Sequence, residues 1–228
     1  MCFACILTLR PRESHNTFVR FIGVKMSNIL RNFWVLEGLD GAGTTTQLRK
    51  LEAYLSEKGA KVHCTAEPTV NETGRFLRRV LSGEVRVPQS TVAYLFAADR
   101  DDHVNNPEYG IVSHVEAGEI VVSDRYIFSS LAYQSIGFDF DRVMELNQAF
   151  PFPEVVMFID TPLQSCIDRI DARGQAKEIY ERLDYQSQVL ENYERVFSSL
   201  PSGCRLVRVD GSMTREAIFD CITRELGI

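Results

Sequence analysis

Long apolar runs and an excess of positive charge are both missing from this sequence. No run approaches the ~18 residues of a membrane-spanning helix, so we predict no membrane segment. Its 25 Lys and Arg residues are outnumbered by 31 Asp and Glu residues, which gives a formal net charge of −6. General nucleic-acid binders usually carry a basic surface, so this composition argues against that class. An anionic ligand must instead be held locally, by a cluster of cations and backbone amides.

Cysteine pairs with the spacing of a zinc site are also missing. The only close pair among the six cysteines is Cys2 and Cys5, and no second Cys or His pair follows at the usual spacing. His15 and His63 are too isolated in the sequence to complete such a site. We therefore interpret the cysteines as small apolar residues of a protein in a reducing compartment, and we expect a cytoplasmic location.

The chain of 228 residues has no internal repeat or low-complexity linker, which indicates one folded domain. Its first 25 residues place a short apolar run before the arginines, the reverse of a secretory signal. An organelle-targeting segment is an alternative, although the segment is short and contains Glu13. A start at Met26 would put the first predicted strand only a few residues in. We expect residues 1–25 to be a poorly ordered N-terminal extension and residues 26–228 to be the domain.

Apolar runs and helical spacings alternate along the chain, which predicts an α/β fold with a five-stranded parallel sheet and helices on both faces. Ligands of such sheets bind at the carboxyl ends of the strands. Short apolar runs predict strands at 33–38, 61–68, 119–126, 154–162 and 205–211. Amphipathic spacing and helix-stop residues predict helices at 45–58, 74–83, 89–106, 108–117, 141–150, 181–197 and from about 213, with another opening at Pro162.

The stretch GLDGAGTTTQ at 38–47 follows the first predicted strand and precedes a helix. It has the spacing of the phosphate-binding pattern G-x-x-x-x-G-K-[ST], with Gly38 and Gly43 in place and Thr45 as the hydroxyl that ligates Mg²⁺. Thr44 stands where the pattern has lysine, so it can donate a hydrogen bond but brings no charge. Loss of that lysine removes transition-state stabilisation unless another cation is supplied. A plain glycine-rich turn is the alternative interpretation.

Further polar residues stand near the ends of the other predicted strands. Asp124 and Arg125, in SDRYIFSSLAYQ, could face a phosphate and its magnesium, or form a structural ion pair. Phe96 and Arg100 share one helix face and could stack on and hydrogen-bond a base, although Phe96 alone would suit a core. Glu67 precedes a proline and could equally mark a turn.

A cluster of basic residues surrounds a glycine near the end of the fourth predicted strand–helix unit. Its members are Arg169, Arg173, Lys177 and Arg182. A mobile basic flap that closes over phosphates would have this composition, and so would an ordinary solvated helix end. Both interpretations stay open for this segment.

These motifs together resemble thymidylate kinases. The stretches FWVLEGLDGAG with TTTQ, AEP, LFAADRDDHV, VVSDRYIFSSLAYQ and FIDTPLQSCIDRIDARG occur in the order and spacing of that family. The resemblance covers about residues 32–228, and DRY-x-x-S-x-x-A-Y together with F-A-A-D-R is close to diagnostic. It implies a P-loop nucleoside-monophosphate-kinase fold and transfer of the ATP γ-phosphoryl group to dTMP with Mg²⁺, giving dTDP and ADP. It also implies a homodimer formed through helices of this domain.

The resemblance assigns roles to the matching positions. The residues expected to bind ATP are those of the loop and one flap arginine: Gly38, Leu39, Asp40, Gly41, Ala42, Gly43, Thr44, Thr45, Thr46 and Arg173. The residues expected to bind dTMP are Asp40, Glu67, Phe96, Arg100, Arg125, Ser129, Ser130, Tyr133 and Gln134. The expected catalytic residues are Asp40, Asp124, Arg125 and Arg173, with Thr45 as the metal ligand.

Several of these positions carry a particular task in the family. Asp40 would approach the sugar 3′-hydroxyl and the reacting phosphates, and Arg125 would hold the dTMP phosphate. Phe96 would stack on thymine, and Arg100 would bond its exocyclic oxygen. Tyr133 falls where the family blocks a ribose 2′-hydroxyl, so selectivity for deoxynucleotides is expected. Ser129 and Ser130 fall where the family reads the base edge, and Gln134 lies just beyond. Glu67 falls at the edge of the nucleoside site, and Asp124 would organise the metal and its water.

Two departures from the family pattern concern cations. Thr44 replaces the loop lysine, and the flap reads QAKEIYE where many members carry a second arginine. The charge opposing the phosphates would then come from Arg173, Lys177 and Mg²⁺. Three hypotheses follow: an active dTMP kinase, favoured by the full set of acceptor-side residues; a nucleotide-binding protein without useful turnover; and a kinase for another acceptor, such as dUMP, dCMP or a nucleoside.

Overall fold

The computed structural model describes residues 28–172 and 183–228. The predicted extension and the flap residues Arg173, Lys177 and Arg182 lie outside the described residues. The sheet has five strands in the order β2-β3-β1-β4-β5, and every neighbouring pair is parallel, which confirms the predicted α/β fold. The strands are β1 (Ile29–Gly38), β2 (Val62–Ala66), β3 (Ile120–Asp124), β4 (Phe152–Asp160) and β5 (Arg205–Asp210).

The central strand β1 pairs with β3 on one side and β4 on the other, and Trp34 lies opposite both Val122 and Val155. A parallel strand covered on both faces is mainly apolar, which is why residues 33–36 of this strand are recognisable as an apolar run. β1 begins at Ile29, earlier than predicted. In the first part of β1, Asn32 has φ 58°, and the pairing with β4 shifts register between Leu30 and Trp34. Arg31 and Asn32 are exposed, so the apolar pattern is broken there and does not mark the start of the strand.

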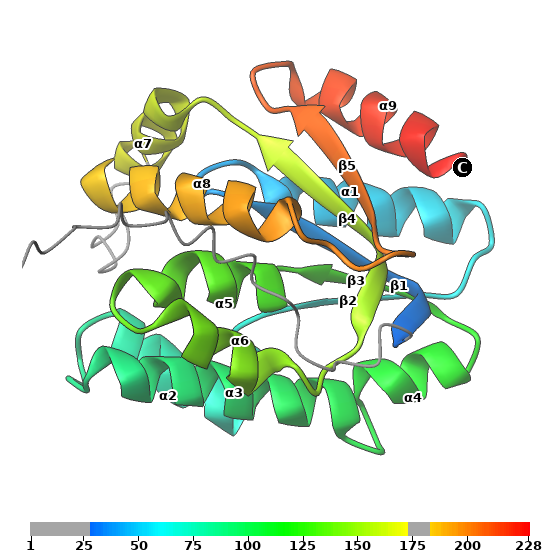
Figure 1. Ribbon diagram of the computed structural model, residues 1–228. Coiled ribbons are helices and arrows are strands. Elements are labelled where there is room, and N and C mark those ends of the chain that lie inside the picture. Colours follow the sequence, from blue (N-terminus) through cyan, green and yellow to red (C-terminus); the bar gives the residue numbers. More distant parts are fainter. Residues whose placement is uncertain (1–27, 173–182) are drawn as a thin grey trace, which may run out of the picture.

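The helices lie on both sides of the sheet (Figure 1). Their bounds are α1 (Thr44–Glu57), α2 (Glu72–Leu81), α3 (Gln89–Asn105), α4 (Ile111–Glu116), α5 (Ile127–Tyr133), α6 (Phe140–Asn147), α7 (Leu163–Asp171), α8 (Leu183–Phe197) and α9 (Arg215–Leu226), with a short 3-10 helix η1 (Gln134–Ile136). Helices α1 and α9 contact one another and cover strands on one side. Helices α3, α4, α5 and α6 form a layer on the other side, where α8 packs on α5.

Helix α5 is the element that periodicity does not predict. All seven of its residues are buried, so it carries no polar face and no amphipathic pattern. It is covered by α8 and follows directly on the carboxyl end of β3. Its position brings Ser129, Ser130 and Tyr133 to the end of the sheet where ligands of parallel folds bind.

Among the described helices, none combines the length and apolar character needed to cross a membrane. The cysteines in the described ranges, Cys64, Cys166, Cys204 and Cys221, are free. Burial raises the pKa of Cys166 to about 11 and that of Cys204 to about 12, so both pack as uncharged apolar side chains. Cys2 and Cys5 lie outside the described residues.

Candidate active site

The loop between β1 and α1 turns tightly at the carboxyl end of the sheet. Gly41 and Gly43 have φ of 87° and 102°, in the left-handed region that favours glycine. At Gly41 a Cβ would also lie 2.5 Å from the carbonyl oxygen of Cys166 in α7. Helix α1 begins at Thr44, so its amino terminus and the positive end of its dipole adjoin the loop. This strand–loop–helix geometry is the one that phosphate binding requires.

The position of the missing lysine is closed, because Thr44 is only 7% exposed and packs inside the loop. A cation reaches the same loop from α7 instead. Arg169 Nη1 donates to the carbonyl oxygens of Gly41 and Ala42, each at 3.2 Å. Sequence reasoning placed Arg169 in a basic cluster without a role of its own. Through these contacts Arg169 holds the loop in place and brings positive charge beside the loop.

Thr45 and Asp124 form a polar corner between the loop and β3. The Thr45 hydroxyl donates to Asp124 Oδ2 at 2.5 Å. Asp124 Oδ1 is buried and has no hydrogen-bond partner within the described part of the chain. A buried carboxylate oxygen of this kind normally binds something, because leaving it alone is costly. Hydroxyl and carboxylate oxygens are the ligands that Mg²⁺ prefers, so these two side chains fit the predicted metal position.

A cavity open to solvent lies beside the loop, and its lining combines aromatic rings with charged and hydroxyl side chains, as small-molecule sites do. Every residue expected to bind dTMP lines it except Ser130, whose hydroxyl accepts from Arg100 Nη2 at 2.9 Å behind the wall. The full lining is Asp40, Glu67, Pro68, Leu81, Phe96, Arg100, Arg125, Tyr126, Ser129, Tyr133 and Gln134.

Arg125 lies in this cavity with φ 76°, a conformation uncommon for a residue other than glycine. Its N–H donates to Leu36 O at 2.9 Å, which ties the turn to β1. The guanidinium donates to Asp40 Oδ1 at 2.5 Å and to Ser129 Oγ at 3.0 Å. Burial opposes the charge, but Tyr133 and Asp40 outweigh burial and raise the pKa of Arg125 above its ordinary value. The cavity therefore holds a permanent cation whose fork matches a phosphate.

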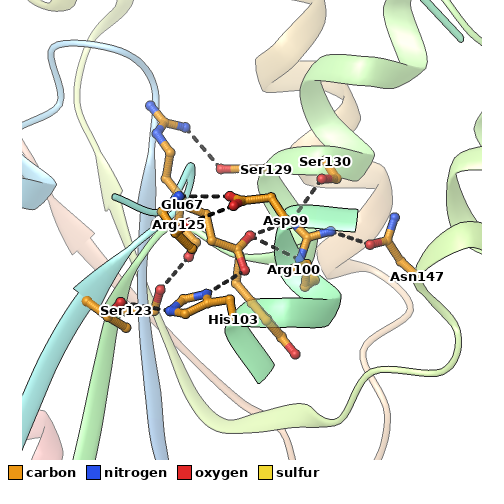
Figure 2. A network of polar contacts seen from close by, with 12 residues as sticks. Glu67, Asp99, Arg100, His103, Ser123, Arg125, Ser129, Ser130 and Asn147 are labelled. Atoms are coloured by element: carbon orange, nitrogen blue, oxygen red, sulfur yellow. Dashed lines mark hydrogen bonds and ion pairs between the residues drawn. The ribbon is translucent and has the colours of Figure 1, made fainter. Parts of the chain in front are cut away.

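Glu67 and Arg100, which also line the cavity, belong to a buried ion network (Figure 2). Glu67 accepts from Arg100 Nε at 3.0 Å and Nη2 at 2.5 Å, and its other oxygen is 3.0 Å from His103 Nδ1. Arg100 also donates to Asn147 and to Ser130. Burial opposes ionisation of Glu67, but Arg100 and His103 outweigh burial and lower its pKa. Glu67 thus holds Arg100 in place, a task beyond its expected position at the edge of the nucleoside site.

Glu37, the last side chain of β1 before the loop, is fully buried. Its Oε1 accepts from the N–H groups of Tyr126 and Ser129 at 2.9 and 3.2 Å. Its Oε2 accepts from the hydroxyls of Ser129 and Tyr193 at 2.6 and 2.7 Å. Burial raises the pKa of Glu37 to about 7, against the opposing influence of Arg125. This carboxyl fixes the chain on the carboxyl side of the strained Arg125.

Sequence reasoning missed five residues that shape the site. One carried a signal, since Glu37 is an acidic residue inside an otherwise apolar strand. The others carried none, because their contacts join residues far apart in the chain; Gln186 Nε2, for example, donates to Asp40 Oδ2 at 2.9 Å from helix α8. The missed residues are Glu37, His103, Asn147, Gln186 and Tyr193.

Fold and loop together define the class of P-loop proteins with a nucleoside-monophosphate-kinase architecture. Residues 36–222 match the family described as Thymidylate kinase. A Treponema pallidum protein that carries a provisional thymidylate kinase name is 39% identical over 202 residues, 87% of this chain and 96% of that protein. The Desulfotalea psychrophila protein named thymidylate kinase is 34% identical over 180 residues, 77% of this chain and 84% of that protein. The chain belongs to the thymidylate kinase family.

Proposed function

We propose that this protein transfers the γ-phosphoryl group of ATP to dTMP, giving dTDP and ADP. One juxtaposition carries the proposal: Asp40 belongs to the loop, and its carboxylate contacts Arg125 in the cavity at 2.5 Å. A donor phosphate on the loop and an acceptor phosphate on Arg125 would meet at Asp40, as in-line transfer requires. The names of the relatives support dTMP as the acceptor.

The base of dTMP would lie between Phe96 and the polar wall of the cavity. Phe96 is 9% exposed and lines the cavity, so its ring is available for stacking. Arg100 supplies an N–H donor toward a base carbonyl. Gln134 Oε1 is buried, and residues 28–172 and 183–228 offer it no hydrogen-bond donor, so it supplies an acceptor for a base N–H. One donor beside one acceptor suits the oxo and imino edge of thymine.

The sugar and phosphate would lie toward the loop. Tyr133 OH accepts from the N–H of Asp40 at 3.1 Å, and this contact supports a position for the ring beside the sugar, where it would oppose a 2′-hydroxyl. Arg125 would exchange its carboxylate partner for the acceptor phosphate. Thr45 and Asp124 would hold Mg²⁺, which when bound neutralises charge on the ATP phosphates. Asp40 would approach the 3′-hydroxyl and the reacting phosphates.

Thr44 favours a second candidate function, a nucleotide-binding protein without useful turnover. The missing lysine ordinarily stabilises charge on the transferred group. Arg169 is a described cation at the loop, and Arg173 and Lys177 lie outside the described residues. We propose that Arg169 and Arg173 together replace the charge of the missing loop lysine, with Arg173 as the cation of the flap. The third candidate, a kinase for another acceptor, would change the base contacts of Gln134 and Arg100.

The experiment that separates the three is ADP release from Mg-ATP with dTMP, dUMP, dCMP, UMP and thymidine offered in parallel, with dTMP binding measured by calorimetry on the same protein. Selective release with dTMP is expected. A faster rate with another acceptor would support the third candidate. Tight binding of dTMP without ADP release would support the second. Arg125→Met should abolish the response to dTMP, because the acceptor phosphate would lose its cation.

We also propose a cytoplasmic homodimer. The absence of a described membrane-crossing helix and the reducing-compartment reading of the cysteines support the location. Two neighbouring helices, α2 and α3, expose Phe76 at 37% and Tyr94 at 56%, and exposed aromatic side chains are enriched at protein interfaces. Light scattering of the purified chain should give twice the monomer mass, and Tyr94→Glu should lower it.

A further inference from the structure

Three potential metal ligands converge at the end of the sheet opposite the candidate active site. His63 is near the start of β2, His114 lies in α4, and Glu119 lies just before β3. The two imidazole rings are stacked, with centroids 3.6 Å apart and planes 10° from parallel. His114 Nδ1 is 2.8 Å from Glu119 Oε2. One ligand atom from each residue lies within 4.8 Å of the other two.

We propose that His63, His114 and Glu119 bind one Zn²⁺ ion, with water as the fourth ligand. Two imidazoles and one carboxylate are a donor set that zinc accepts in tetrahedral sites. Imidazole nitrogen also favours zinc over Mg²⁺, which prefers oxygen ligands throughout. This site is therefore chemically distinct from the oxygen corner formed by Thr45 and Asp124.

The cluster is open to solvent. His114 and Glu119 are 23% and 26% exposed, so an ion can reach all three side chains. A metal site needs such an entry path.

Only small movements separate the present arrangement from coordination. Zinc–nitrogen bonds of about 2.0–2.1 Å place two ligands of a tetrahedral ion about 3.3 Å apart. The His114–Glu119 contact is 2.8 Å, and all three ligand atoms lie within 4.8 Å of one another, so the present separations lie on either side of that value. The hydrogen bond would be exchanged for coordination, and each ring would tilt toward a common point. The bound ion would then fasten α4 to β2, a strand at the edge of the sheet.

The test is zinc binding to the full chain, in buffer without Mg²⁺ or nucleotide, by equilibrium dialysis with elemental analysis. His63→Ala and Glu119→Gln remove two ligands from different elements. Glu116→Gln is the matched control, because Glu116 is an exposed glutamate of α4, the helix that carries His114. We expect the wild type to bind one zinc ion per chain. The zinc affinity should fall by about tenfold or more in both ligand variants and should be unchanged in the control.

Co²⁺ gives a second readout that does not depend on stoichiometry alone. The visible absorption bands of tetrahedral Co²⁺ should develop in the wild type and in Glu116→Gln, and should be lost in Glu119→Gln. Circular dichroism checks that each variant is folded, and His63→Gln serves if His63→Ala is not. Equal zinc affinity in the wild type and in folded ligand variants would overturn the proposal, and so would the absence of any stoichiometric binding.

Discussion

Replacing Glu37 with glutamine isolates the effect of one buried charge beside the loop. Glutamine has the shape of glutamate and keeps an oxygen to accept from the N–H groups of Tyr126 and Ser129. Its amide nitrogen can donate to the hydroxyls of Ser129 and Tyr193, which rotate their own hydrogens away. Glu37→Gln therefore removes an ionisable group while preserving the contacts that hold the turn after Arg125.

The sign and size of the effect follow from the pKa. Burial raises the pKa of Glu37 from an ordinary 4.5 to about 7. A carboxyl with a raised folded-state pKa contributes stability that is fully present below its unfolded pKa and is lost as pH rises through the folded one. At 1.36 kcal/mol per pH unit, the full loss is about 3 kcal/mol, and about 2 to 3 kcal/mol of it falls between pH 5 and pH 8.

Urea unfolding at pH 5, 6, 7 and 8 measures this directly. The stability of Glu37→Gln relative to wild type should rise by about 2 to 3 kcal/mol between pH 5 and pH 8, because the variant has no charge to bury. Glu116→Gln, an exposed substitution, should track the wild type at every pH. A difference between Glu37→Gln and wild type that stays constant with pH would refute the reasoning.

Three further predictions concern the cations of the site. Thr44→Lys should change kcat by less than about tenfold if other cations already replace the lysine, and a rise of about a hundredfold in initial-rate assays would contradict that view. Arg169→Met should raise KM for ATP and leave KM for dTMP nearly unchanged, because the described hydrogen bonds of Arg169 go to Gly41, Ala42 and Gly211, none of which lines the cavity. Arg100→Met should lower the free energy of unfolding by about 3 to 5 kcal/mol, because it leaves the buried carboxylate of Glu67 without its arginine partner. Adding Glu67→Gln to it should recover much of that loss in urea unfolding, and no recovery would argue against the ion pair as the cause.

Much of the fold could be predicted because the strands are short, mainly apolar segments that are followed by polar residues. Asp40, Glu67 and Asp124 each follow such a run, so parallel pairing brought them to one edge of the sheet. Most residues that line the acceptor cavity were instead expected from the resemblance to thymidylate kinases. Helix α5 was not, because burial on every side removes the periodicity that marks a helix.

Contacts between distant segments were beyond the reach of sequence patterns. Tyr193 donates to Glu37 across 156 residues, and nothing in either stretch indicates that they meet. His63 was dismissed as a zinc ligand because no second ligand stands near it in the sequence. The fold brings the His114 ring into stacking contact with His63. This contact depends on the parallel pairing of β2 with β3 and on the packing of α4 against the sheet.

The Asp40–Arg125 pair makes the acceptor pocket a site with a built-in competitor. The Arg125 guanidinium already binds the Asp40 carboxylate at 2.5 Å, so an incoming anion has to displace a partner that belongs to the same chain. A doubly charged phosphate can do so, and the freed Asp40 carboxylate is then released beside the sugar hydroxyl it is proposed to serve. An uncharged nucleoside carries no anionic group that could replace the Asp40 carboxylate on Arg125. Discrimination against molecules without a phosphate would therefore begin before any contact with the base is made.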